Sequence, residues 1–197
     1  MTVRNVHITR ATLAKWIDPR VPIHPLFFKL SAVHQSDYLR CYLLHVHGGG
    51  YSDLKWTSRS WVPFFEAVEK SSCLGAGYTE IGPHGVAPVG GRLEKILRKD
   101  YAKLIGCGAM IFKPRTEFTE RWFLKLTATI DRKASELSRN PAQSPRDRPG
   151  VRYATGELSR YPIRWTELMG NIFHPLIHIY QHRILHLDMA PSFENYK

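Results

Sequence analysis

Two neighbouring stretches decide the fold of this chain: SDYLR at residues 36–40 and GGGYSDLK at residues 48–55. Ser36 can cap a helix, and Asp37 suits its first turn, where unpaired N–H groups favour an anion. Apolar residues then follow at helical spacing, and three glycines end the helix and permit positive φ. Residues 51–55 alternate as a strand does. Asp53 is therefore expected at a strand end beside a flexible turn, where α/β proteins often bind ligands.

Strand-like and helix-like segments alternate along the rest of the chain. We expect further strands over residues 3–9, 73–79 and 109–113, and helices over residues 61–70, 92–104 and 116–137. Thr9 can cap a helix that runs to about residue 17, and residues 82–91 resemble a mobile Gly/Pro-rich connection. This alternation predicts an α/β sheet protein, and 197 residues fit one domain over 1–197.

Residues 139–160 form a stretch rich in arginine, proline and glycine, without a helix or strand period. One interpretation is a disordered surface loop. The other is a lid or acceptor-binding loop, because long loops in compact domains are often functional. Both interpretations predict a mobile Arg-rich loop.

The net charge limits the classes of partner that the chain is expected to bind, and the cysteine pattern indicates its cellular compartment. The net charge of +11 suits nucleic acid, an anionic membrane surface or the diphosphate of a sugar nucleotide. No nucleic-acid signature interleaves the aromatic and basic residues, so nucleic acid is not expected. Three widely spaced cysteines suggest a reducing compartment. Without an apolar run of about 20 residues or a signal peptide, a soluble, cytoplasmic protein is expected.

The two opening stretches resemble the sugar-binding region of nucleotide-sugar glycosyltransferases with an Asp-x-Asp motif. That family shows Ser-Asp-x-x-Arg, a helix, Gly-Gly-x-Tyr and then Asp-x-Asp. The chain is most similar to the branch of capsular-polysaccharide synthesis proteins and their viral relatives, which it also resembles at residues 23–25, 104–116 and 161–176. Family members normally have another strand-turn-helix unit before the region of Val3, and only 35 residues precede Ser36 here. That first unit is therefore expected to be missing.

The resemblance implies a GT-A-like nucleotide-diphospho-sugar transferase domain with a central mixed sheet. Its implied activity is transfer of a hexose or pentose from a UDP- or GDP-sugar donor to a glycan or polysaccharide acceptor. The competing hypothesis is a non-catalytic basic module that binds an anionic glycan or nucleic acid. By resemblance, the donor is contacted by Asp37, Arg40, Gly49, Gly50, Tyr51, Asp53 and Lys55.

Lys55 stands where the family has its second acid, the usual ligand of Mn²⁺ or Mg²⁺, and an ammonium group cannot coordinate a cation. Three interpretations stay open. Asp53 holds the divalent cation with help from another group such as His174. Alternatively, Lys55 supplies positive charge to the diphosphate. In the third interpretation Lys55 points to solvent and the protein is impaired.

Two carboxylates are the catalytic candidates, Asp53 and Glu167. Trp165 lies beside Glu167 and would disfavour its charged form, which suits a group that accepts the acceptor's proton; a first-turn helix acid is the plain alternative. Gly106 and Gly108 permit close backbone approach, so with Trp165 they are expected to wall the acceptor site, or else to form a tight strand entry.

Histidines recur every four residues at His174, His178, His182 and His186. On a continuous helix they would form a stripe with workable metal-binding geometry, although such polar stripes are more often edges of the core. His174 differs because it lies in the Phe-His-Pro segment of the resemblance. It is expected either to contact metal or diphosphate, or to be an ordinary buried histidine.

Overall fold

The computed structural model describes residues 2–55 and 59–193. Four strands form one mixed sheet in the order β1-β3-β2-β4. The strands are β1 (Gly49–Ser52), β2 (Gly75–Thr79), β3 (Ile105–Phe112) and β4 (Ile184–His186). β3 is antiparallel to both β1 and β2, whereas β4 is parallel to β2. The expectation of an α/β fold with a mixed sheet is confirmed.

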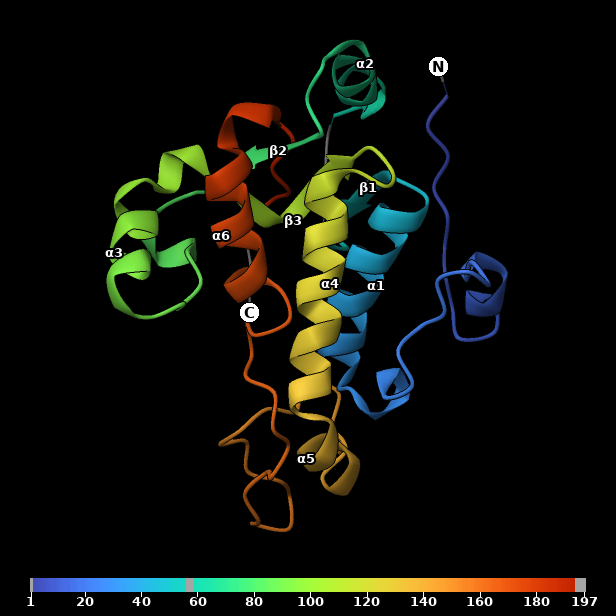
Figure 1. The fold of residues 1–197 in the computed structure, drawn as a ribbon, viewed down its shortest axis with the longest axis vertical. Helices are drawn as coiled ribbons and strands as arrows, with labels where there is room; N and C mark the ends of the chain where they lie inside the picture. Colours follow the sequence, from blue (N-terminus) through green and yellow to red (C-terminus); the bar gives the residue numbers. More distant parts are fainter. Residues whose placement is uncertain (1, 56–58, 194–197) are drawn as a thin grey trace.

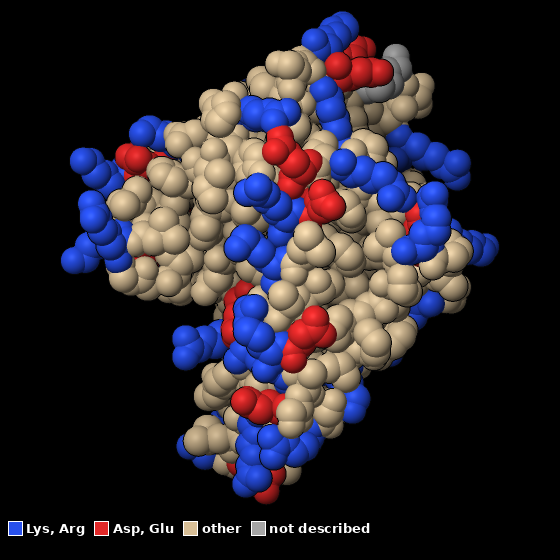
Figure 2. Space-filling model, viewed as in Figure 1, with Lys and Arg blue, Asp and Glu red and all other residues tan. Residues whose placement is uncertain are grey.

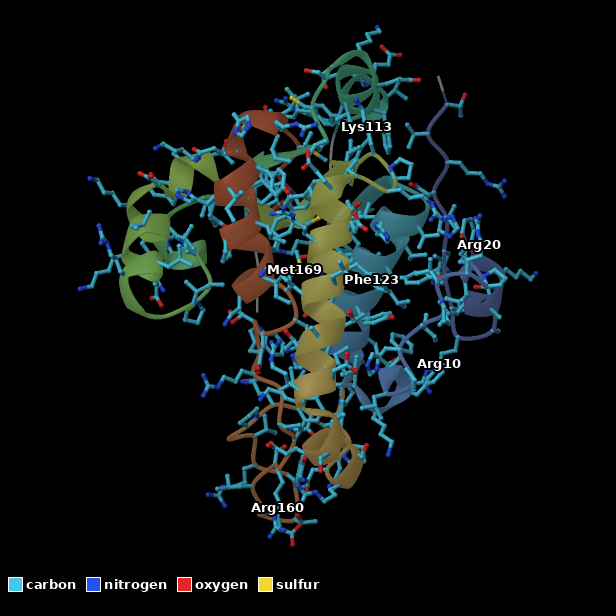
Figure 3. The ribbon with its side chains drawn as sticks, in the orientation of Figure 1. Arg10, Arg20, Lys113, Phe123, Arg160 and Met169 are labelled. Atoms are coloured by element: carbon cyan, nitrogen blue, oxygen red, sulfur yellow. The ribbon has the colours of Figure 1, made fainter. Side chains whose placement is uncertain are left out.

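Three helices, α1 (Ala32–Val46), α4 (Glu117–Arg132) and α6 (Gly170–Tyr180), lie side by side with α4 in the middle (Figure 1). Phe123 of α4 faces α1 (Figure 3), where its ring contacts Tyr38, Tyr42 and His45. On its other side α4 packs on α6 through Trp122, whose ring centroid lies 4.8 Å from that of Phe173. The main hydrophobic core lies between this helix layer and one face of the sheet.

A smaller apolar cluster covers the opposite face of the sheet, where α2 (Val62–Lys70) packs on β2 and β3. α3 (Gly91–Lys99) lies at the outer edge beside α6, and α5 (Ala134–Arg139) follows α4 (Figure 1). Short 3-10 helices connect these elements: η1 (Leu13–Trp16), η2 (Phe27–Lys29), η3 (Pro83–Gly85), η4 (Tyr101–Lys103) and η5 (Gln181–Arg183).

Several predicted boundaries are wrong. Residues 3–9 form no strand, and Thr9 bonds Thr12 in a turn before η1 instead of capping a helix. α1 begins about one turn earlier than predicted, because its N-cap is Ser31 and not Ser36. The Ser31 side chain accepts a hydrogen bond from the His34 amide. The histidine stripe does not exist, because α6 ends at Tyr180 and the last two histidines lie in η5 and β4.

β3 contains a bulge that the sequence did not predict. Gly77 of β2 pairs with Met110, but Thr79 pairs with Ile105, so β3 carries extra residues between these points. Gly106 and Gly108 therefore lie inside β3 and not at its entry. Bulges re-aim side chains and often occur beside functional sites.

Lysine and arginine side chains are scattered over the face seen in Figure 2, with acidic residues between many of them. No helix in the described ranges is long and apolar enough to cross a membrane.

Candidate functional site

A buried ion pair on α1 forms the centre of the candidate site. Asp37 and Arg40 are one turn apart, and their side chains meet at 3.2 Å between Oδ1 and Nη2. Both lie on the inward side of the helix, with only 5% and 9% of their surfaces exposed. Burying two charges is costly unless they are paired and hydrogen-bonded, and a buried pair of this kind is a candidate for a functional site.

Arg40 connects this pair to the sheet. Its Nη1 donates to the Cys107 carbonyl oxygen at 2.6 Å, and its guanidinium carbon lies 4.0 Å from the ring centroid of Tyr51. The Nε atom is buried and has no hydrogen-bond partner among the described residues. Arg40 thus retains one N–H donor without an acceptor in the described part of the chain.

Tyr51 and Asp53 complete the cluster from β1. The Tyr51 hydroxyl donates to Asp53 Oδ1 at 2.8 Å, and burial raises the pKa of Tyr51 to about 12, so the phenol stays a donor. The Asp53 amide donates to the Gly108 carbonyl at 2.8 Å, which fixes the residue just after β1. The structure therefore brings together Asp37, Arg40, Tyr51 and Asp53, which the sequence placed in two separate motifs.

The bulge of β3 is shaped around Tyr78, a residue that sequence reasoning missed. A Cβ atom on Gly106 would lie 2.1 Å from Cζ of the Tyr78 ring, so only glycine leaves room there. The Gly108 amide donates to the Tyr78 hydroxyl at 3.2 Å. A Cβ atom on Gly108 would lie 3.3 Å from Asp53 Oδ2. The two glycines thus hold Tyr78 and border Asp53. Their role as walls of an acceptor site stays a prediction.

The two glycines that open β1 have structural reasons of their own. Gly49 has a φ of +99°, and the space beside it is open. A Cβ atom on Gly50 would lie 2.8 Å from the Trp61 ring, so Gly50 lets the start of α2 approach the sheet. Donor contact by these two residues stays a prediction.

The C-terminal segment covers the Asp53 side of the cluster. The Lys55 ammonium lies 4.8 Å from the ring centroid of Phe193, and this ring also contacts Tyr78. A Cβ atom on Gly108 would lie 3.5 Å from Pro191 Cγ. Lys55 thus lies at the border of the cluster, with its ammonium near an aromatic ring.

His174 is almost fully buried and has its own set of partners. The Ala87 amide donates to its Nδ1 at 3.0 Å, so Nδ1 carries a lone pair and the ring proton is on Nε2. Nε2 lies 3.4 Å from a Glu80 carboxylate oxygen and 3.5 Å from the Cys107 sulfur. The nearby Glu80 carboxylate favours the doubly protonated, charged ring. The second proton would have to sit on Nδ1, however, where it would face the N–H of Ala87. We therefore assign the neutral ring. These contacts fit the second of the two expectations for His174, an ordinary buried histidine.

The arrangement does not fit a preformed metal site. Asp53 is bonded to Tyr51, whereas His174 contacts Glu80 and Cys107. Across residues 2–55 and 59–193, no group of three or more His, Cys, Asp or Glu side chains is placed to hold a metal ion. A divalent cation at Asp53 would therefore need oxygens from a bound ligand, and metal binding stays a prediction.

Glu167 and Trp165 have partners outside the cluster. One oxygen of Glu167 accepts from the Arg164 amide at 2.8 Å, and the other lies 3.4 Å from the Lys133 ammonium. Both oxygens of Glu167 are thus engaged by groups outside the Asp37–Asp53 cluster. Trp165 itself is 43% exposed and stacks with Arg148. The roles of Glu167 as a base and of Trp165 as a pocket wall stay predictions.

The Arg-rich loop has defined internal contacts. Asp147 is fully buried and accepts from the Gln143 amide and the Tyr153 hydroxyl. Arg160 lies at the far end of the molecule from the sheet (Figure 3). A lid role over Asp53 would therefore need a large displacement, and mobility of residues 139–160 stays a prediction.

The buried position of Asp37 predicts a pH dependence of stability. Burial, only partly offset by Arg40, raises the pKa of Asp37 from 3.8 to about 6, so the native state keeps a proton that the unfolded chain has lost. The associated stability is complete below the unfolded pKa and is lost as the pH rises through 6. When the pH rises from about 4 to about 7, the free energy of unfolding of the wild type should fall by about 2–3 kcal/mol relative to that of Asp37→Asn. Urea unfolding of both proteins measures this, and a pH-independent difference would contradict it.

Comparisons of the chain with protein-family models, curated proteins and solved structures find no match. The function is therefore inferred from the residues and their geometry.

Proposed function

We propose that this protein is a glycosyltransferase that moves a sugar from a nucleotide-diphosphate donor to a glycan acceptor. One observation carries the proposal. The acid and the arginine of the Ser-Asp-x-x-Arg helix lie in one cluster with the acid that follows β1. Asp37 pairs with Arg40, and Arg40 contacts the Tyr51 ring. The Tyr51 hydroxyl in turn donates to Asp53. The resemblance to Asp-x-Asp glycosyltransferases rests on these same residues. The GT-A identity of the fold belongs to this proposal.

The cluster offers the groups that sugar transfer from a diphosphate requires. The glycosidic bond to the diphosphate breaks as an acceptor hydroxyl attacks the anomeric carbon, and negative charge grows on the leaving diphosphate. Arg40 has a fixed guanidinium with a buried, unused Nε donor among the described residues. Asp37 and Asp53 can accept hydrogen bonds from sugar hydroxyls. The site thus combines a cation for phosphate with acids for sugar.

Lys55 supplies the second positive charge of this proposal. Its ammonium lies at the border of the cluster near Phe193, at the place where the related motif has an acid. A cation there can stabilise the leaving diphosphate without a metal, and a bound metal would use Asp53 and the diphosphate oxygens. Activity that persists in excess EDTA would favour Lys55, and activity that EDTA abolishes would favour the metal.

Ligand-induced thermal stabilisation tests the proposal. A UDP- or GDP-sugar at 100 times its Kd should stabilise the protein by about 2.7 kcal/mol, which corresponds to a rise in Tm of roughly 5–10 °C for a chain of this size. Asp53→Asn should lose most of this rise, whereas Asp131→Asn, a change at an exposed carboxylate on α4, should keep it. Stabilisation by oligonucleotides but by no nucleotide sugar would favour the basic binding module instead.

A further inference from the structure

α3 is held to the molecule by one side and presents the other side to solvent. Leu97 is fully buried and belongs to the main core. Glu94 accepts from Arg98 Nε at 2.8 Å, and Arg98 also donates to the Pro83 carbonyl. Leu97 and the bond from Arg98 to Pro83 hold the helix to the rest of the molecule, so its other side is left facing solvent.

The outward side combines basic and aliphatic side chains. Arg92, Ile96 and Lys99 are spaced i, i+4 and i+7, which places them on one face, and Leu93 lies one turn before Ile96. Leu93 and Ile96 are 41% and 36% exposed, large fractions for aliphatic residues on a well-packed helix. Within the described part of the chain, Arg92, Lys95 and Lys99 form no ion pair.

The position of α3 makes this surface accessible. The helix lies at the outer edge of the molecule, beyond α6 (Figure 1). Lysine and arginine side chains gather at the same edge in Figure 2. The outward side chains of the helix are therefore exposed to solvent at this edge.

We propose that the outward face of α3 docks the protein on an anionic phospholipid surface. Interfacial helices place cations at the level of acidic headgroups and insert aliphatic side chains just below them, which matches Arg92, Lys95 and Lys99 beside Leu93 and Ile96. Nucleic acid would pair with the cations but offers nothing for the two aliphatic side chains. The charge and the exposed apolar groups together therefore fit a membrane surface.

Co-sedimentation of the full chain with vesicles tests this docking. Binding should be much stronger to phosphatidylcholine vesicles that contain phosphatidylserine than to phosphatidylcholine alone. Leu93→Ser/Ile96→Ser should weaken binding to the acidic vesicles by about tenfold or more, because both side chains lose apolar burial. Replacing Arg92, Lys95 or Lys99 by glutamine should cost about fivefold for each cation removed.

Matched variants elsewhere on the surface serve as controls. Leu124 and Ile179 are exposed on α4 and α6 at 58% and 56%, so Leu124→Ser/Ile179→Ser should leave vesicle binding unchanged. Arg4→Ala/Arg10→Ala removes two exposed cations from the N-terminal segment and should also have little effect. Equal losses in the α3 and control variants would overturn the proposal. So would unchanged vesicle binding in Leu93→Ser/Ile96→Ser, or binding to an oligonucleotide in preference to acidic vesicles.

Discussion

Asp37→Asn and Arg40→Ala should each lower sugar transfer by about ten- to a hundredfold or more, because each removes a charge-assisted contact worth about 1.5–3 kcal/mol from a buried site. The two residues meet at 3.2 Å, and Arg40 also contacts the Tyr51 ring. Losing either one therefore disturbs the other. The measurement is kcat/KM for transfer from the donor that gives the largest thermal stabilisation.

Stability must be measured with activity in these variants. Removing one partner of a buried ion pair leaves the other charge uncompensated, which typically costs about 3–5 kcal/mol. Arg40→Lys keeps the charge and loses the forked geometry, so it should fold better than Arg40→Ala and still lose most activity. Asp131→Asn on the surface should leave activity unchanged. Wild-type turnover in folded Asp37→Asn and Arg40→Lys would refute the assignment of this pair.

Gly106→Ala should be among the most destabilising single-methyl substitutions in the chain. The new Cβ would lie 2.1 Å from Cζ of Tyr78, and that ring is held in place by the hydrogen bond from the Gly108 amide. Overpacking of this kind costs about 3 kcal/mol, which corresponds to a fall in Tm of roughly 6–12 °C for a chain of this size. Because the bulge also carries the Cys107 carbonyl that binds Arg40, transfer activity should fall as well.

Gly108→Ala is the matched control for this prediction. Its Cβ would meet no atom closer than 3.2 Å, so its cost should be clearly smaller. Adding Tyr78→Ala to Gly106→Ala should relieve the clash, and the double variant should then be more stable than additivity of the two single changes predicts. Equal destabilisation by the two glycine substitutions, or strict additivity with Tyr78→Ala, would contradict the role assigned to Tyr78.

Local patterns in the sequence predicted the elements that carry the central cluster. The glycines after α1 predicted a turn into a strand that ends near Asp53, and Asp53 does follow β1 directly. The strand covers Gly49–Ser52, however, and not the predicted residues 51–55. Thr116, the first residue of the helix predicted over residues 116–137, caps α4 and forms a reciprocal capping box with Thr119. Such features depend on residues only a few positions apart, so a single sequence reveals them.

Features that depend on contacts between residues far apart in the sequence could not be predicted from local patterns. Residues 3–9 alternate like a strand, but no strand among the described residues pairs with them. Alternation in one segment cannot indicate whether a partner strand exists. Both Ser31 and Ser36 can cap a helix, and the structure uses Ser31, whose backbone amide donates to the Tyr161 hydroxyl from far along the chain. The fit of Tyr78 over Gly106 links two strands, and no local pattern indicates it.

The same limit applies to Glu80 and His174. Their side chains meet at 3.4 Å although the two residues are far apart in the sequence, Glu80 just after β2 and His174 in the middle of α6. The sequence identified His174 through its resemblance but gave no signal for Glu80. Spatial pairing between elements so far apart in the chain requires the tertiary structure.

The most direct test of the central claim follows the side chain of Arg40 by NMR during titration with UDP- and GDP-sugars. Its Nε–H group is buried and has no hydrogen-bond partner among the described residues, so its signal should shift when a donor phosphate or sugar binds beside it. Loss of that signal in Arg40→Lys assigns it. We predict a saturable shift for at least one nucleotide sugar, absent in Asp53→Asn. Donor binding that leaves the Arg40 signal unmoved would contradict the proposed site.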